Sequence, residues 1–372
     1  MRLTSDGKTE AFLAEAEKKG VDSSVFLSYE PVFDSNIEYF TGFRQERAHA
    51  SACLLVEEGG MTLLVSKLEY DRALNELKGV DVVSKKEYGN SLLKFLKARL
   101  KGKKRIGVNE NIFPYRVYRK FSSRKFLDVS EIAYNLRSVK EAREIKALSK
   151  ATRITNIGIK FIEDNISLGV SERELSLQLE QEVMRKGVEG FSFPPIIKSG
   201  ASSAYIHPYP SVSERKIGRG LGMIDFGVIC DGYCSDTTIP LKIGKLNKKE
   251  EAIADTVEEA YRKSIDALRV GEPTWKIFEV AENVIKGGGF EFKHSLGHGI
   301  GLDVHEFPNL SPRPEKKKEL KKWKEETLRG NMVFTIEPGI YEPGIGGYRL
   351  ENDIILTKKG PEILTNAKTL EL

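Results

Sequence analysis

The sequence of 372 residues predicts an α/β domain at the amino end, followed by a larger α+β domain. Two observations support this prediction. In the first third of the chain, short β-rich runs alternate with helical patterns, which is typical of a compact α/β domain. Later, two helical patterns, β-like sequence, two more helical patterns and further β-like sequence follow one another. We therefore expect domains over residues 1–132 and 136–372.

The first domain is expected to contain a β-hairpin and an amphipathic helix. Residues 52–56 and 61–65 are β-rich runs on either side of a glycine-containing loop, which favours a hairpin. Leucines recur at helical spacing over residues 92–100, and Gly102 marks the end of that helix.

The second domain is expected to contain four helices. Ser138 with Glu141 forms a capping-box pattern, in which the serine oxygen and the glutamate satisfy free amides at a helix start. A second such pattern begins at Ser171. Apolar residues at helical spacing continue these two helices and indicate two later ones, over residues 142–152, 171–183, 253–268 and 275–285.

Composition excludes several classes of protein. Lys+Arg 59 against Asp+Glu 54 leaves a net charge of +5, too small an excess for a dedicated nucleic-acid binder. The basic segments 94–105 and 316–324 contain leucine or glutamate, which favours solvated surfaces, and we expect a solvated excursion over 315–326. Three cysteines cannot form a disulfide framework, which favours the cytoplasm. No apolar run is long enough to span a membrane, and no signal peptide is expected.

Two aspartates flank a predicted turn at Asp231 and Gly232. Asp225 and Asp236 lie on the two arms of this hairpin, so their carboxylates can share one face. Neighbouring buried carboxylates repel each other unless a cation binds them. Alternatively, one aspartate caps a turn or faces solvent, and for an isolated pair we prefer this second interpretation.

Three of the five histidines, His294, His298 and His305, lie close together in the sequence. Alternating glycines between them indicate that the backbone approaches something closely. Neutral imidazoles are common metal ligands and acid/base groups. A lone histidine is usually structural or exposed, but this clustering favours a functional site.

Glu337 and Glu351 are placed among apolar strand residues. A glutamate in such a position is costly unless it is paired or bound to metal, although a single one can face water at a strand edge. Combined with the residues above, they give four carboxylates and one imidazole. This set suits a pair of divalent ions better than a cysteine-rich structural zinc site, and such a pair acts as a Lewis acid.

The order of these five residues resembles the metallopeptidases of the pita-bread fold, which include methionine aminopeptidase, aminopeptidase P and prolidase (Xaa-Pro dipeptidase). Residues 36–43 (NIEYFTGF) are similar to a segment of the creatinase/prolidase amino-terminal domain. The resemblance implies a pita-bread (creatinase/aminopeptidase) catalytic domain, preceded by a smaller creatinase-like α/β domain. A long amino-terminal domain favours the Xaa-Pro branch of the family.

The resemblance also implies two divalent metal ions per subunit, with Mn, Co, Fe and Zn all suitable for these ligands. Asp225 would chelate one ion, whereas Asp236 and Glu351 would bridge both. His298 and Glu337 would complete the second site.

Other roles follow from the same resemblance. Glu337 would also move the proton of the attacking water, and His305 would stabilise the oxyanion. His207 and His294 would face the substrate. Arg349 would orient the acidic ligands.

The implied activity is hydrolysis of the Xaa-Pro bond of dipeptides or short peptides by a cytoplasmic homodimer. An Xaa-Pro aminopeptidase acting on longer peptides is the main alternative, and a non-catalytic binding module is disfavoured because all five ligands are present. Asn309 follows His305–Pro308 where prolidases of the archaeal type carry an arginine for the dipeptide carboxylate. Arg313 or a nearby lysine can substitute. His49 is expected at the surface, or at the partner's site in a dimer.

Overall fold

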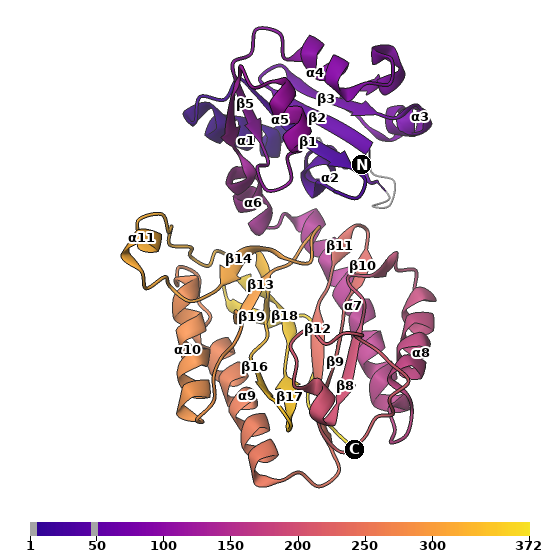
Figure 1. The fold of residues 1–372 in the computed structure, drawn as a ribbon, viewed down its shortest axis with the longest axis vertical. Helices are drawn as coiled ribbons and strands as arrows, with labels where there is room; N and C mark the ends of the chain where they lie inside the picture. Colours follow the sequence, from indigo (N-terminus) through magenta and orange to yellow (C-terminus); the bar gives the residue numbers. More distant parts are fainter. Residues whose placement is uncertain (1–5, 46–50) are drawn as a thin grey trace. The chain divides into compact units, whose positions relative to one another are not determined.

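Figure 1 shows the computed structural model, which describes residues 6–45 and 51–372. Contacts divide the chain into two compact units, Met1–Arg137 and Ser138–Leu372. The division falls at the end of helix α6 (Ser130–Ser138). Among the described residues, no helix combines the length and the apolar character needed to cross a membrane.

The first unit is built on a mixed six-stranded sheet. Strand β1 pairs antiparallel with β2 and parallel with β5, and β2 and β3 form the predicted hairpin, which is confirmed. In order across the sheet, the strands are β4 (Asp81–Ser84), β3 (Gly60–Val65), β2 (Ser51–Glu57), β1 (Ser23–Tyr29), β5 (Arg105–Val108) and β6 (Lys125–Asp128).

Helices cover both faces of this sheet because successive side chains of a strand point to opposite faces. Val25 and Leu27 belong to a core cluster that also contains residues of two helices on one side. Phe26 packs instead against Phe12 and Phe40 from the other side. The helices of this unit other than α6 are α1 (Asp6–Lys18), α2 (Ser35–Thr41), α3 (Lys67–Glu76), α4 (Leu92–Arg99) and α5 (Tyr115–Lys120), with a 3-10 turn at Lys85–Tyr88. Helix α4 is the one predicted over 92–100.

The second unit contains two larger sheets and two small ones. One has the order β20 (Leu370–Glu371), β12 (Thr237–Ile243), β9 (Gly220–Phe226) and β8 (Ile196–Ser199). The other has the order β14 (Glu306–Leu310), β13 (Gly297–Gly299), β15 (Met332–Ile336), β18 (Asn352–Thr357) and β19 (Gly360–Ile363). The small sheets are formed by β11 (Tyr233–Cys234), β10 (Val228–Cys230) and β7 (Gly190–Phe191), and by β16 (Gly339–Glu342) and β17 (Gly346–Arg349).

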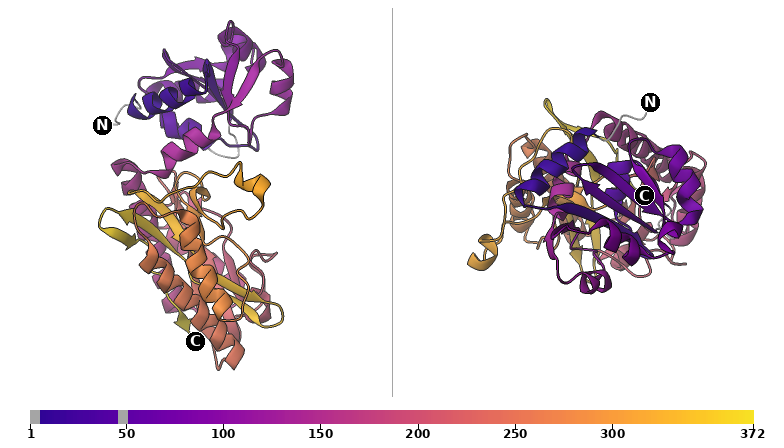
Figure 2. Two further views of the ribbon diagram at one scale, coloured as in Figure 1. Left: turned by 90° about the vertical axis from the view of Figure 1, so that its left-hand side faces the viewer. Right: turned by 90° about the horizontal axis from the view of Figure 1, so that it is seen from above.

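Two pairs of long helices accompany these sheets, as predicted. Figure 1 shows α7 and α8 to one side of the strands and α9 and α10 to the other, and Figure 2 shows the same helices from a second direction. One large buried cluster contains apolar residues of all four helices and of the strands between them. The helices are α7 (Ala142–Asn165), α8 (Glu172–Met184), α9 (Lys248–Ala267) and α10 (Thr274–Gly287).

The predicted cap at Ser138 is wrong. Helix α7 begins after Glu141, which forms a capping box with Glu144. The chain before it is extended, because Val139 bridges to Met332 in the neighbouring strand. The hydroxyl of Ser138 instead accepts a hydrogen bond from Arg329 at 2.7 Å.

Candidate metal centre

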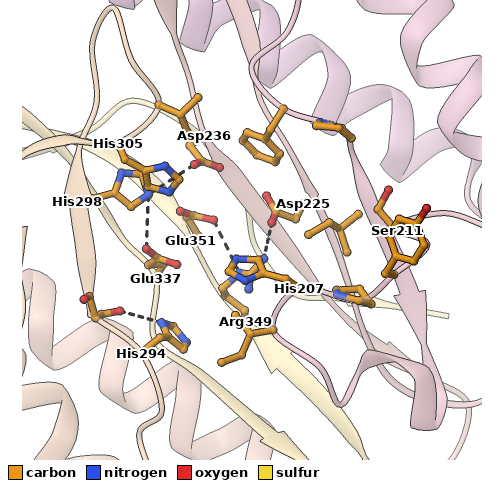
Figure 3. Close-up of a pocket in the computed structure, with 18 of the residues that line it drawn as sticks. His207, Ser211, Asp225, Asp236, His294, His298, His305, Glu337, Arg349 and Glu351 are labelled. Atoms are coloured by element: carbon orange, nitrogen blue, oxygen red, sulfur yellow. Dashed lines mark hydrogen bonds and ion pairs between the residues drawn. The ribbon is translucent and has the colours of Figure 1, made fainter. Parts of the chain in front are cut away.

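A cavity of about 890 Å³ opens in the second unit. It brings together nine residues that the sequence analysis singled out (Figure 3). They are Asp225, Asp236, His298, Glu337 and Glu351, predicted as metal ligands, and His207, His294, His305 and Arg349. His49 lies outside the described residues.

The two aspartates reach the cavity from the ends of paired strands. Asp231 and Gly232 have positive φ angles of 52° and 83° and form the predicted turn between β10 and β11. Strand β9 then pairs with β12 so that Asp225 lies opposite Thr238, and Asp236 immediately precedes β12. The carboxylates therefore share a cavity without being direct partners across the ladder.

Asp236, His298 and Glu351 form the tightest group of possible metal ligands. Each is buried, and one ligand atom from each lies within 4.8 Å of the others. His298 Nε2 is 3.7 Å from Asp236 Oδ2 and 3.6 Å from Glu337 Oε1. One carboxylate oxygen of Asp225 and one of Asp236 are buried without a hydrogen-bond partner. Buried acceptors of this kind normally have a partner, so the group fits a bound cation.

Arg349 connects the acidic residues on the other side of the cavity. Its guanidinium is buried, forms an ion pair with Asp225 and donates a hydrogen bond to Thr238 Oγ1 at 2.8 Å. The Thr238 hydroxyl in turn donates to Glu351 Oε2 at 2.6 Å. Arg349 also donates to the Tyr341 hydroxyl at 2.8 Å. The sequence analysis did not predict Thr238 or Tyr341 as parts of this network.

The glycines beside His298 serve strand packing. A β-carbon added at Gly297 or Gly299 would collide with the carbonyl oxygens of Thr335 and Phe307, which belong to the neighbouring chain segments. The close approach predicted from these glycines is therefore an approach between strands. His298 Nδ1 lies 3.1 Å from the carbonyl oxygen of Gly299, which leaves Nε2 directed toward the carboxylates (Figure 3).

The other three histidines surround the acidic group. The His305 ring lies 4.3 Å from the His298 ring. His294 is in contact with the Tyr341 ring, and its Nε2 is buried without a hydrogen-bond partner. His207 lines the cavity from an exposed loop.

Burial and mutual repulsion dominate the electrostatics of the site. Desolvation, followed by repulsion from neighbouring carboxylates, raises the pKa of Asp236 and of Glu351 well above the usual range. Desolvation also raises the pKa of Glu337 to about 7. It lowers the pKa of His298 to about 3, aided by the nearby His305. The imidazole of His298 is therefore neutral, as a metal ligand must be.

Glu337 should make the metal-free protein less stable as the pH rises. Its pKa goes from the ordinary value of 4.5 to about 7 on folding, so the folded state binds more protons between these values. The contribution of Glu337 to the free energy of unfolding is complete below pH 4.5. It is lost as the pH rises to 7, and the total loss is about 3 kcal/mol. Urea denaturation of chelator-treated protein at several pH values measures this slope. The slope should decrease in Glu337→Gln, and an equal slope in both proteins would contradict the assignment.

The segment after Asn309 is anchored beside the cavity mouth. Asn309 lines the cavity, and its backbone amide donates to Glu326 Oε2 at 3.0 Å. Burial raises the pKa of Glu326. Residues 315–326, predicted as a solvated excursion, contain a short, mostly exposed helix, α11 (Lys317–Leu320). Glu326, the last residue of this segment, is partly buried.

Arg313 does not substitute for the arginine that archaeal prolidases carry at the position of Asn309. Its guanidinium lies between the rings of Trp275 and Trp323, 5.6 Å from each centroid. Among the described residues that line the cavity, Arg173 and Arg349 are the arginines. Sequence reasoning did not single out Arg173, and no local signal distinguishes it from other charged residues at helix starts.

Fold and site together define a two-unit protein whose cavity carries a mixed carboxylate and imidazole group suited to metal-dependent hydrolysis. Residues 146–358 match metallopeptidase family M24, and residues 8–139 match the creatinase/prolidase N-terminal domain. The chain belongs to metallopeptidase family M24. The predicted family, fold class and metallopeptidase activity are thereby confirmed, and this family is metal-dependent.

Similar proteins cover nearly the whole chain. It is 33% identical to an Xaa-Pro dipeptidase of Pyrococcus horikoshii, over 97% of this chain and 97% of the relative. The crystal structure of a prolidase from Pyrococcus horikoshii OT3 superposes with a TM-score of 0.86 at 32% identity and covers 98% of this chain and 99% of that one. An X-Pro aminopeptidase from Thermotoga maritima superposes with a TM-score of 0.80 at 28% identity, covering 98% and 100%.

Proposed function

We propose that this protein hydrolyses the Xaa-Pro bond at the amino end of dipeptides or short peptides. The observation that carries this proposal is the buried group of four carboxylates and one imidazole at the cavity. The Xaa-Pro dipeptidase and prolidase relatives, similar over nearly the full chain, support the choice of substrate.

We assign the predicted ligands to two divalent ions, Mn, Co, Fe or Zn. Asp225 would hold one ion, Asp236 and Glu351 would bind both, and His298 and Glu337 would complete the second site. The buried carboxylate oxygens of Asp225 and Asp236 without partners support this assignment. When bound, the ions supply a Lewis acid and a water of lowered pKa.

The chain's own residues handle protons and charge. Glu337, which lines the cavity beside His298, takes the proton of the attacking water and passes it to the proline nitrogen. His305 donates to the oxyanion, while His207 and His294 position the substrate. Arg349 holds Asp225 and, through Thr238, Glu351 in place.

We further propose a cytoplasmic homodimer with domain limits at 1–132 and 136–372. All three cysteines are buried thiols outside any disulfide, which supports a reducing compartment.

Comparing Ala-Pro with Ala-Pro-Ala on metal-reconstituted protein tests the proposal. Cleavage of both at the proline bond, with Ala-Ala-Ala left intact, is the expected result. Cleavage of the tripeptide alone would remove the dipeptidase assignment and leave an Xaa-Pro aminopeptidase. This second candidate is favoured by neutral Asn309 at the cavity wall, with the carboxylate of Glu326 bonded to its backbone. Failure to cleave any of the three peptides would remove both.

A further inference from the structure

We propose that Arg173 binds the carboxyl terminus of the peptide substrate and thereby selects short peptides with a free carboxylate. The inference rests on the proposed function and concerns the substrate class of the same cavity. Arg173 is the second residue of α8 and lines the cavity with a half-exposed side chain.

The charges that line the cavity are distributed unevenly. Its acidic residues are Asp225, Asp236, Glu337 and Glu351, of which the last three lie around His298, whereas Asp225 lies beside Arg349 (Figure 3). The buried cation among them is Arg349, whose guanidinium is already engaged by Asp225, Thr238 and Tyr341.

Arg173 is the remaining arginine among the described lining residues, which include no lysine. A short peptide of neutral residues carries its negative charge on the terminal carboxylate. Near the acidic group this carboxylate would be repelled, and at Asn309 it would meet a neutral amide with the Glu326 carboxylate close by. Arg173 offers the favourable partner.

The backbone of Arg173 is held in place, whereas the ion-pair partner of its guanidinium can be exchanged easily. Glu172 is fully buried, pairs with Lys198 and accepts a hydrogen bond from Ser213 Oγ at 2.7 Å. The Arg173 amide donates to the Ser213 carbonyl at 3.0 Å, so the start of α8 is held against the segment that lines the cavity.

The guanidinium itself pairs through Nε with Glu214 Oε1 at 2.5 Å, and Glu214 is largely exposed. Exposed ion pairs contribute little stability. A substrate carboxylate can therefore replace Glu214 and form charge-assisted, two-point hydrogen bonds with the guanidinium.

The test compares Arg173→Gln with wild type on peptides with free and amidated carboxyl ends. The assay offers the metal-reconstituted protein six substrates, which are Ala-Pro, Ala-Pro-Ala and Ala-Pro-Ala-Ala, each as acid and as amide. We expect KM for the acid of the best-bound length to rise about tenfold in Arg173→Gln with little change in kcat, because a hydrogen bond to a charged group is lost from binding. KM for the matching amide should stay unchanged. Glu214→Gln should lower KM for the acid, since it frees the guanidinium.

Arg215→Gln is the matched control. Arg215 lies two residues beyond Ser213, has an exposed side chain and lines a neighbouring hollow of about 420 Å³ rather than this cavity. It should behave as wild type on every peptide. Equal effects of Arg173→Gln on acids and amides, or an unchanged KM for every acid, would overturn the inference.

If wild type cleaves none of the peptides, the proposed function fails. Calorimetric binding of the same acid and amide pairs then decides the role of Arg173 separately. Weaker binding of the acid alone in Arg173→Gln supports that role, and binding unaffected by the substitution overturns it.

Discussion

Replacing Asp236 with alanine is expected to abolish peptidase activity even in the presence of excess Mn or Co. Asp236 is buried and lies next to both His298 and Glu351 in the ligand group. In the proposed site it bridges both ions, so its loss weakens both positions at once. Metal chemistry worth several kcal/mol disappears, which corresponds to a decrease in kcat/KM of about a thousandfold or more. Peptide hydrolysis with added metal measures this loss.

Asp231→Asn is the control for Asp236→Ala, because asparagine tolerates the positive φ of 52° at this turn position. Asp231 belongs to the same hairpin, but its side chain is 56% exposed and pairs with Lys150 at 3.1 Å. This variant should retain wild-type activity, because an exposed ion pair contributes little. Full activity of Asp236→Ala with added Mn or Co would refute the bridging assignment.

The stability of the metal-free protein should increase in Asp236→Ala, although the activity is lost. Without metal, repulsion from Glu351, Asp225, Asp353 and Glu337 adds to the burial that raises the pKa of Asp236. Removing its carboxylate relieves this repulsion, so metal-free Asp236→Ala should melt at a higher temperature than metal-free wild type. Metal should raise the melting temperature of wild type far more than that of the variant. Thermal melts with and without chelator distinguish this result from simple misfolding.

The sequence allowed the acidic centre to be predicted because its members follow local patterns. Asp225 and Asp236 flank a turn that its Asp-Gly pair identifies, and Glu337 comes directly after the apolar strand β15. Their meeting in one cavity depends on strand pairing between distant segments. The family resemblance implied that these residues form one site, whereas local patterns alone did not.

Other contacts could not be predicted from local pattern. Thr238 joins Arg349 to Glu351 only because β12 places it opposite Asp225, and a threonine in a strand is otherwise unremarkable in sequence. Ser138 has a cap-like pattern, but pairing of Val139 with Met332 keeps the chain extended there. In both cases tertiary contacts decide what a local pattern leaves open.

Replacing Arg349 with methionine is expected to destabilise the metal-free protein by about 3–5 kcal/mol at neutral pH, because it leaves a buried carboxylate without its cation. Arg349 is 3% exposed and pairs with Asp225, which is itself buried. Desolvation already raises the pKa of Asp225, and the arginine opposes that rise. Urea denaturation of chelator-treated protein measures the loss.

The pH dependence and the conservative substitution identify the cause. Without Arg349, the carboxyl of Asp225 can avoid the cost of its charge by protonation, so the destabilisation should be smaller at pH 5 than at pH 8. Arg349→Lys keeps the charge but lacks the planar fork that reaches Asp225, Thr238 and Tyr341 together, and it should fall between wild type and Arg349→Met. Arg262→Met, which removes an exposed partner of Glu259, should have almost no effect. A loss that is independent of pH, or equal in Arg349→Met and Arg349→Lys, would show that Arg349 acts through packing and not through its charge.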